Sequence, residues 1–218
     1  MNKTDTVIVR PRRSGDPEAD LTTFQIVHRA MRGEVRRLAA LTAGQGETPF
    51  PPEREAAIQS LLGPLTDEIH AHHAKEDRIL WPVVAASAGA AIDLLPLSEE
   101  HAEIDPYLER IRAGRGRERA EALAALRDLL DEHIVEEEAV LFPVIRQYVS
   151  AEDFTACEKR FQKGSSFAHL KFLLPFIAAY AAPEELARML KEAGLPMRIL
   201  VRLFQPGYLR TQRAVYGS

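Results

Sequence analysis

Histidine and glutamate recur at the same spacing in two segments of this sequence, and this pattern is the one most suited to chemistry. Glu76 follows His72 by four residues, and Glu137 follows His133 by four residues. That spacing places both side chains on one face of an α-helix, with their Cβ atoms about 6 Å apart. Imidazole is a borderline ligand that suits iron, and a carboxylate is a harder ligand that can bridge two cations. The two segments are therefore predicted to supply two metal-binding pairs.

Both pairs belong to an internal repeat with an offset of 61 residues. The aligned residues are His72 with His133, Glu76 with Glu137, Asp77 with Glu138, Leu80 with Leu141, Trp81 with Phe142, and Pro82 with Pro143. A repeat of this kind indicates two helical hairpins related by a pseudo-two-fold axis.

The repeat also selects among neighbouring residues. His70 and His73 have no histidine counterpart, so His72 is favoured as the ligand, with His73 open as an additional one. Glu136, Glu137 and Glu138 are consecutive, and only the register of the repeat favours Glu137 over Glu138 as the metal-bridging carboxylate. One histidine from each of two further helical segments, His28 and His101, completes a candidate set of four histidines and two glutamates.

Four long helices are expected to position these residues. Apolar residues recur at helical spacing in a first segment that ends near residue 43, with Asp20 or Thr22 as its N-cap, and over about 53–86, 98–113 and 117–149, with glycine or proline between the segments. Gly63-Pro64 predicts a kink in the second helix, Ser98 is the predicted N-cap of the third, and Pro106 predicts a kink or a later start there. We therefore predict an all-α protein with an up-down-up-down four-helix bundle over residues 16–149.

The two ends of the chain differ from this bundle. Residues 1–15 are polar and predict an extended lead-in. Residues 150–218 contain several glycines and prolines and predict three or four shorter helices. We expect this C-terminal helical extension to pack on the bundle, because about 70 residues make a thin core on their own.

With these features the sequence resembles the hemerythrin-like, or HHE cation-binding, family over about 16–149. The resemblance rests on His28, on His72-x-x-x-Glu76 followed by Leu80-Trp81-Pro82, on His101, and on His133-x-x-x-Glu137 followed by Leu141-Phe142-Pro143. It implies a centre of two non-haem iron ions, oxo- or hydroxo-bridged when oxidised, with the two glutamates as bridges. It also implies that O₂ or a related small ligand binds at an open position. One assignment puts His28 and His72 on one iron and His101 and His133 on the other, and the pairing stays open.

The sequence departs from the oxygen-carrying hemerythrins at one position. Those proteins have two histidines one turn apart on the third helix, whereas Asp105 stands four residues after His101 here. Asp105 either replaces the missing ligand or leaves the position open. The departure disfavours simple reversible O₂ carriage and favours reaction with peroxide or nitric oxide, or sensing.

Three functional hypotheses follow. The first is a protein that binds or senses O₂ or nitric oxide, and the second is a di-iron enzyme that decomposes peroxide or reduces nitric oxide. The third is a structural metal-binding interaction module. No set of nucleophile, base and orienting residue is visible, and no glycine-rich phosphate-binding loop is present.

Composition excludes several other classes. A net charge of −4 over 218 residues argues against a nucleic-acid binder. The single cysteine, Cys157, rules out an intrachain disulfide and fits a reducing cytoplasm. The segment after Glu192 contains arginines and no acidic residue, so it could contact a membrane surface or a protein partner. The favoured interpretation is that its apolar face covers the bundle while its arginines face water or acidic helices.

Overall fold

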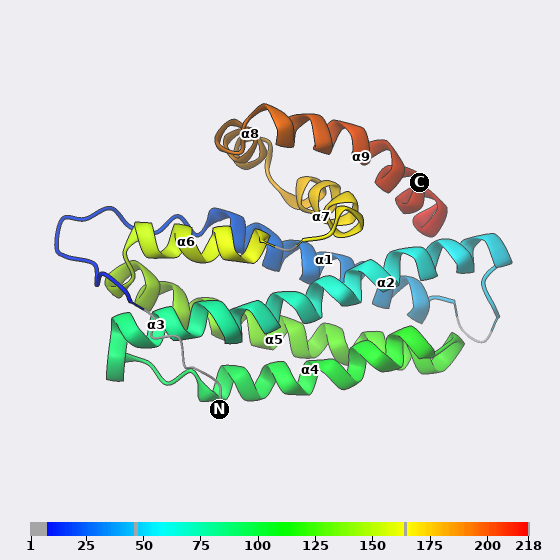
Figure 1. Ribbon diagram of the computed structural model, residues 1–218. Helices are drawn as coiled ribbons and strands as arrows, with labels where there is room; N and C mark the ends of the chain where they lie inside the picture. The colour runs from blue at the N-terminus through cyan, green and yellow to red at the C-terminus, as the bar shows by residue number, and fades with distance from the viewer. Residues whose placement is uncertain (1–7, 46–47, 164, 218) are drawn as a thin grey trace. The chain divides into compact units, whose positions relative to one another are not determined.

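The computed structural model describes residues 8–45, 48–163 and 165–217, and within them every regular element is helical (Figure 1). The elements in chain order are α1 (Thr22–Ala43), α2 (Pro52–Lys75), a π-helical segment (Glu76–Leu80), α3 (Trp81–Ala88), a 3-10 turn (Gly89–Ala91), α4 (Leu95–Ala113), α5 (Gly116–Tyr148), α6 (Ala151–Gln162), α7 (Phe167–Tyr180), α8 (Pro183–Glu192) and α9 (Gly194–Tyr216). This confirms the predicted all-α class.

In the described part of the predicted lead-in, residues 8–15, there is no helix, and residues 1–7 lie outside the described residues. Among the described helices, none is long and apolar enough to cross a membrane.

Helix α1 shows how the apolar spacing specifies these elements. Phe24, Val27, Met31, Val35 and Leu38 recur every three or four positions, and all of them are buried. A stripe of this kind on one helix face has to be covered by neighbouring elements, because leaving it in water forfeits the hydrophobic free energy of burial. The helix ends at Ala43, as predicted, and begins at Thr22, close to the two predicted N-caps.

The third long helix begins earlier than the sequence predicts. It starts at Leu95, whose backbone N–H donates to the carboxylate of Asp93 at 3.0 Å. Ser98 is wrong as the N-cap, since it lies inside the helix and its hydroxyl bonds to other side chains. Helix α4 also continues through Pro106, and α2 continues through Pro64 without a break. The loss of one backbone hydrogen bond does not end a helix whose apolar face is packed.

The second long helix changes its hydrogen-bond pattern at Glu76 instead of near Gly63-Pro64. The backbone N–H of Trp81 donates to the carbonyl of Glu76, five residues earlier, which makes the turn π-helical. Pro82 follows directly and has no N–H to offer the preceding turn. The other half of the repeat has Pro143 inside α5 with no such segment. The two halves therefore differ in backbone structure at the predicted ligand Glu76.

The molecule divides into two compact units. The first contains the described residues of 1–21, 71–102 and 132–165, and the second contains those of 22–70, 103–131 and 166–218. Helices α2, α4 and α5 contribute residues to both units. The predicted division at residue 150 between a bundle and an extension remains a prediction.

Within the second unit, α7 lies between α1 and α9 (Figure 1). Gly33 on α1 faces the ring of Tyr180 at the end of α7, and a Cβ atom at Gly33 would collide with that ring. The absence of a side chain at Gly33 therefore allows the two helices to approach closely. The sequence pattern of α1 does not reveal this role, because a glycine inside a helix has several explanations.

A buried carboxylate joins α1 to the C-terminal helices in this unit. The Glu34 side chain is fully buried, and its oxygens accept hydrogen bonds from the hydroxyls of Tyr216 (2.6 Å) and Tyr180 (2.8 Å). They also accept from the Gln212 amide at 3.2 Å and lie 3.4 Å from the Tyr208 hydroxyl. We call these five residues the Glu34 network. Buried polar groups that are satisfied in this way specify one packing arrangement over others.

The Glu34 network predicts a loss of stability at alkaline pH. Burial first, and then the nearby Glu34 charge, raise the pKa of Tyr180, Tyr208 and Tyr216 far above the ordinary tyrosine value. Their raised pKa in the folded state contributes stability that is present below about pH 10 and is lost as the pH rises, because the unfolded chain ionises first. The free energy of unfolding in urea should therefore fall between pH 8 and pH 11. A variant with phenylalanine at all three positions should show a shallower pH dependence, and an equal slope in both proteins would contradict the assignment.

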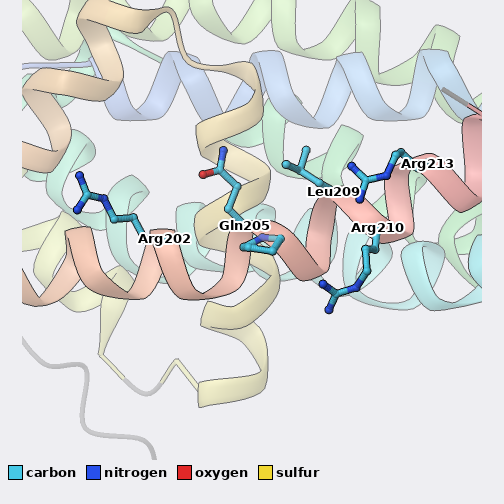
Figure 2. A pocket seen from close by; sticks show the side chains of 6 residues that line it. Arg202, Gln205, Leu209, Arg210 and Arg213 are labelled. Carbon is cyan, nitrogen blue, oxygen red and sulfur yellow. The ribbon is translucent and has the colours of Figure 1, made fainter.

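Helix α9 buries one stripe and exposes its arginines. Val201, Phe204 and Tyr208 are buried, whereas Ile199 and Leu203 are exposed because they lie off that stripe. That this apolar face covers the bundle stays a prediction. A hollow of about 370 Å³ on the helix is lined mainly by the side chains that Figure 2 shows, Arg202, Gln205, Leu209, Arg210 and Arg213. No histidine or carboxylate lines it, so this hollow is not a metal site of the predicted kind.

Candidate metal centre

The first compact unit brings together five of the six predicted ligands. These residues are all buried and come from α2, the π-helical segment, α4 and α5: His72, Glu76, His101, His133 and Glu137. The sixth, His28, is buried on α1 in the second unit, where its ring packs edge-on against Phe24 with 4.7 Å between centroids. The place of His28 in the centre remains a prediction.

The two oxygens of Glu76 are directed toward different histidines. Its Oε1 lies 2.8 Å from His72 Nε2, and its Oε2 lies 3.6 Å from His101 Nε2. The helical spacing of four residues explains the first contact, and the second comes from α4, far along the chain. A carboxylate that reaches two separate nitrogen groups with its two oxygens has the arrangement needed to bridge two cations. Glu137 is equally buried, with Oε2 3.7 Å from His133 Nε2.

The outer ring nitrogens of His101 and His133 bond to carboxylates. His133 Nδ1 donates to Glu100 at 2.6 Å, and His101 Nδ1 donates to Asp77 at 3.2 Å. Because a carboxylate only accepts, each Nδ1 carries a proton, and in the neutral imidazole Nε2 then presents its lone pair. Both Nε2 atoms are buried and have no hydrogen-bond partner among the described residues. This is the arrangement of metal-binding histidines in proteins, so the donor set fits a metal ion.

Burial favours the neutral imidazole at His133. Burial lowers the pKa of His133 below its ordinary value, against the opposing effect of its hydrogen bond to Glu100. A neutral imidazole has a free lone pair, whereas an imidazolium cannot coordinate a cation. The neutral form of His133, which metal binding requires, is therefore favoured.

A chain of hydrogen bonds beside His101 links Trp81, Ser98 and Asp77. The Trp81 indole N–H donates to the Ser98 hydroxyl at 3.0 Å, and that hydroxyl donates to Asp77 at 2.8 Å. The Trp81 ring is also stacked on the ring of His101, with 5.7 Å between centroids. Trp81 therefore covers His101 with its ring and holds the Ser98 hydroxyl that donates to Asp77.

Asp77, Ser98 and Glu100 were not identified as supporting residues in the sequence. The only signals that could have found them are the alignment of Asp77 with Glu138 in the repeat and the position of Glu100 next to His101. Neither signal indicates a contact between helices. The supporting contacts depend on how α4 lies against the neighbouring helices, and this is a property of the tertiary structure.

Hydrogen bonding and burial distinguish the candidate ligands that the sequence left as alternatives. Asp105 bonds to His70 at 2.8 Å, and both side chains are about half exposed, so Asp105 is engaged outside the buried group. Of the three consecutive glutamates on α5, Glu137 is buried, Glu138 is half-buried and Glu136 is exposed. Burial thus favours Glu137, in agreement with the register of the repeat.

His73 is an additional buried histidine beside this group. Its ring lies 4.5 Å from the ring of His101 and 5.2 Å from the ring of His133, measured between centroids. One ring nitrogen from each of these three residues lies within 4.8 Å of the other two. Burial lowers the pKa of His73 well below its ordinary value, and the Glu76 charge opposes this shift.

The carboxylate that supports His133 should affect metal affinity strongly. Replacing Glu100 with alanine removes the acceptor of His133 Nδ1, and such changes typically weaken metal binding by about 10- to 100-fold. A competition titration with a chromophoric chelator measures this change. The matched control is Glu99→Ala, which alters an exposed glutamate one residue away and should leave affinity unchanged. Equal affinities of the two variants would contradict a supporting role for Glu100.

Comparison with known proteins identifies a family. The family model described as "Hemerythrin HHE cation binding domain" matches residues 20–145. The iron-sulfur cluster repair protein DnrN of Neisseria gonorrhoeae is 32% identical over 136 residues, which cover 56% of this chain and 84% of that protein. A DNA nickase of Nostoc is 29% identical over 111 residues, which cover 50% of this chain and only 31% of the nickase. No solved structure matches.

The family match and the observed helices agree on the fold. The HHE domain implies a four-helix bundle, and residues 20–145 contain the helices α1 to α4 and most of α5. Helices α6 to α9 follow this region as additional C-terminal helices. The buried histidine and glutamate groups lie within the matched region as well. This chain belongs to the hemerythrin HHE cation-binding domain family.

Proposed function

We propose that this protein holds two non-haem iron ions and uses them to bind or react with O₂, nitric oxide or peroxide. One observation carries the proposal: His101 and His133 each bond through Nδ1 to a carboxylate and present a buried, unpartnered Nε2 beside Glu76 and Glu137. Imidazole combined with carboxylate suits iron. His28 and His72 would supply nitrogen to one ion, and His101 and His133 to the other, with the two glutamates as bridges.

The protein's own residues would have three roles. The glutamates neutralise part of the metal charge, and the Nδ1 protons held by Asp77 and Glu100 orient the imidazoles. Trp81 and Phe142 are buried, and they would restrict the access of water to the centre. When bound, the iron pair would supply electrons and an open coordination position for a small ligand.

The similarity to an iron-sulfur cluster repair protein supports a role connected with iron chemistry. Asp105 bonds to His70 outside the buried group, which supports a reactive or sensing centre over simple O₂ carriage. Peroxide decomposition and nitric oxide reduction are the corresponding enzymatic candidates.

The test is anaerobic reconstitution with ferrous iron, followed by elemental analysis and an optical spectrum after exposure to air. We expect about two irons per chain and near-ultraviolet bands of a bridged ferric pair. The His101→Ala/His133→Ala variant should lose the metal, whereas His70→Ala, which changes an exposed histidine, should keep it. A single zinc ion, or no metal, in the unaltered protein would overturn the proposal and favour a structural module.

The loaded protein then distinguishes binding from turnover. Peroxide or nitric oxide consumed over many cycles, and lost in His133→Ala, would identify an enzyme. A stable spectrum of the ligand-bound protein without turnover would identify a binding or sensing protein.

A further inference from the structure

His73 breaks the internal symmetry of the candidate metal centre. The repeat offset of 61 residues pairs His73 with Ile134, and both residues are buried. One half of the repeat therefore has an apolar core residue where the other half has an imidazole. A buried position that accommodates isoleucine in one hairpin does not require a histidine for packing.

The imidazole of His73 has no hydrogen-bond partner that would explain its burial. It is 3% exposed, and neither Nδ1 nor Nε2 has a hydrogen-bond partner among the described residues. Burying a polar group in this way costs free energy unless something satisfies it. His70, on the same helix, shows the contrast, because it is exposed and bonds to Asp105.

The rings around His73 point to the group that would satisfy it. One nitrogen each from His73, His101 and His133 lies within 4.8 Å of the others. Two nitrogens bound to one metal ion at about 2.1 Å cannot be more than about 4.2 Å apart. Small side-chain rotations therefore suffice to bring all three nitrogens to a single ion.

We propose that His73 is a third nitrogen ligand of the metal ion held by His101 and His133. This inference rests on the proposed function and adds a ligand to it. The oxygen-carrying hemerythrins have a second histidine on the third helix, and Asp105 stands at that position of α4 here. His73 would supply the additional nitrogen ligand from α2 instead. The metal ion held by His101 and His133 would then have one more nitrogen ligand than the repeat alone predicts.

The decisive variant is His73→Ile, which copies the residue that the other half of the repeat carries. We expect its metal affinity to fall by at least about tenfold, since even supporting residues have effects of that size. The visible ligand-field spectrum of the cobalt-loaded protein should change, because the coordination of one ion changes. The metal-free variant should unfold at the same urea concentration as the unaltered protein or at a higher one, since an unsatisfied polar group is removed.

Controls separate this inference from the proposed function. If the unaltered protein binds no metal, the proposed function fails and the inference fails with it. If the unaltered protein binds two irons and His73→Ile shows the same affinity and cobalt spectrum, only the inference fails. The matched control His70→Gln should change neither readout.

A structural role would give a different result. A histidine needed only for packing would lower the stability of the metal-free His73→Ile protein and leave the cobalt spectrum unchanged, and this outcome would overturn the inference. Should His73→Ile fail to fold, the His73→Gln variant, which keeps a polar side chain of similar size, decides by the same two readouts.

Discussion

Replacing Glu76 with glutamine should remove stoichiometric iron from the protein while leaving its helices intact. The Glu76 oxygens lie 2.8 Å from His72 Nε2 and 3.6 Å from His101 Nε2, so one side chain serves both nitrogen groups. A neutral amide loses the negative charge and offers one oxygen where the carboxylate offers two. We expect the affinity for ferrous iron to fall by more than about 100-fold, beyond the effect of removing a supporting residue. Elemental analysis after reconstitution measures the loss, and far-ultraviolet circular dichroism checks the helices.

The α5 glutamates provide the control for this prediction. Glu137→Gln, which alters the aligned buried residue, should reduce metal binding in the same direction. Glu136→Gln changes the exposed neighbour and should retain about two irons per chain. Full iron occupancy in Glu76→Gln would show that this carboxylate is not a ligand, whatever the result for Glu137.

The Glu34→Leu substitution should destabilise the folded protein by about 3 to 5 kcal/mol. Leucine is apolar and removes the acceptor of the Tyr180 and Tyr216 hydroxyls, which bond to Glu34 at 2.8 and 2.6 Å. It also removes the acceptor of the Gln212 amide. Several donors would then be buried or half-buried without a partner, which is more costly than losing one exposed hydrogen bond. Urea unfolding followed by circular dichroism measures the change.

Single tyrosine variants test whether the loss arises from the Glu34 network. Tyr216→Phe should cost about 1 to 2 kcal/mol, a part of the Glu34→Leu effect. Tyr107→Phe removes a hydroxyl outside the network and should cost less than about 0.5 kcal/mol. If Glu34→Leu unfolds at the same urea concentration as the unaltered protein, the network does not hold α1 to the C-terminal helices.

Local features of the candidate centre follow from the sequence. The four-residue spacing in His72-x-x-x-Glu76 fixes which side chains share a helix face, because the helical period is a property of the backbone. The repeat then identifies His133 and Glu137 without any knowledge of the fold. All four residues prove to be buried in the first compact unit.

Helix boundaries were harder to predict, because side-chain partners outside the helix decide them. Ser98 has the residue type of an N-cap, yet its hydroxyl joins Trp81 to Asp77 and the helix begins at Leu95. Pro64 and Pro106 have the residue type of helix breakers, yet both helices continue through them. Residue preference is a small free energy, and packing of an apolar face readily exceeds it.

The sequence by itself determined the all-α class, the helix faces and the histidine and glutamate pairs of this protein, because these depend on spacing along one helix. Only the tertiary structure decided that His73 joins His101 and His133, that Asp77 and Glu100 orient the imidazoles, and that Asp105 bonds elsewhere. The physical reason is that a contact between helices depends on how their axes are placed and rotated, and many residues set these jointly through packing.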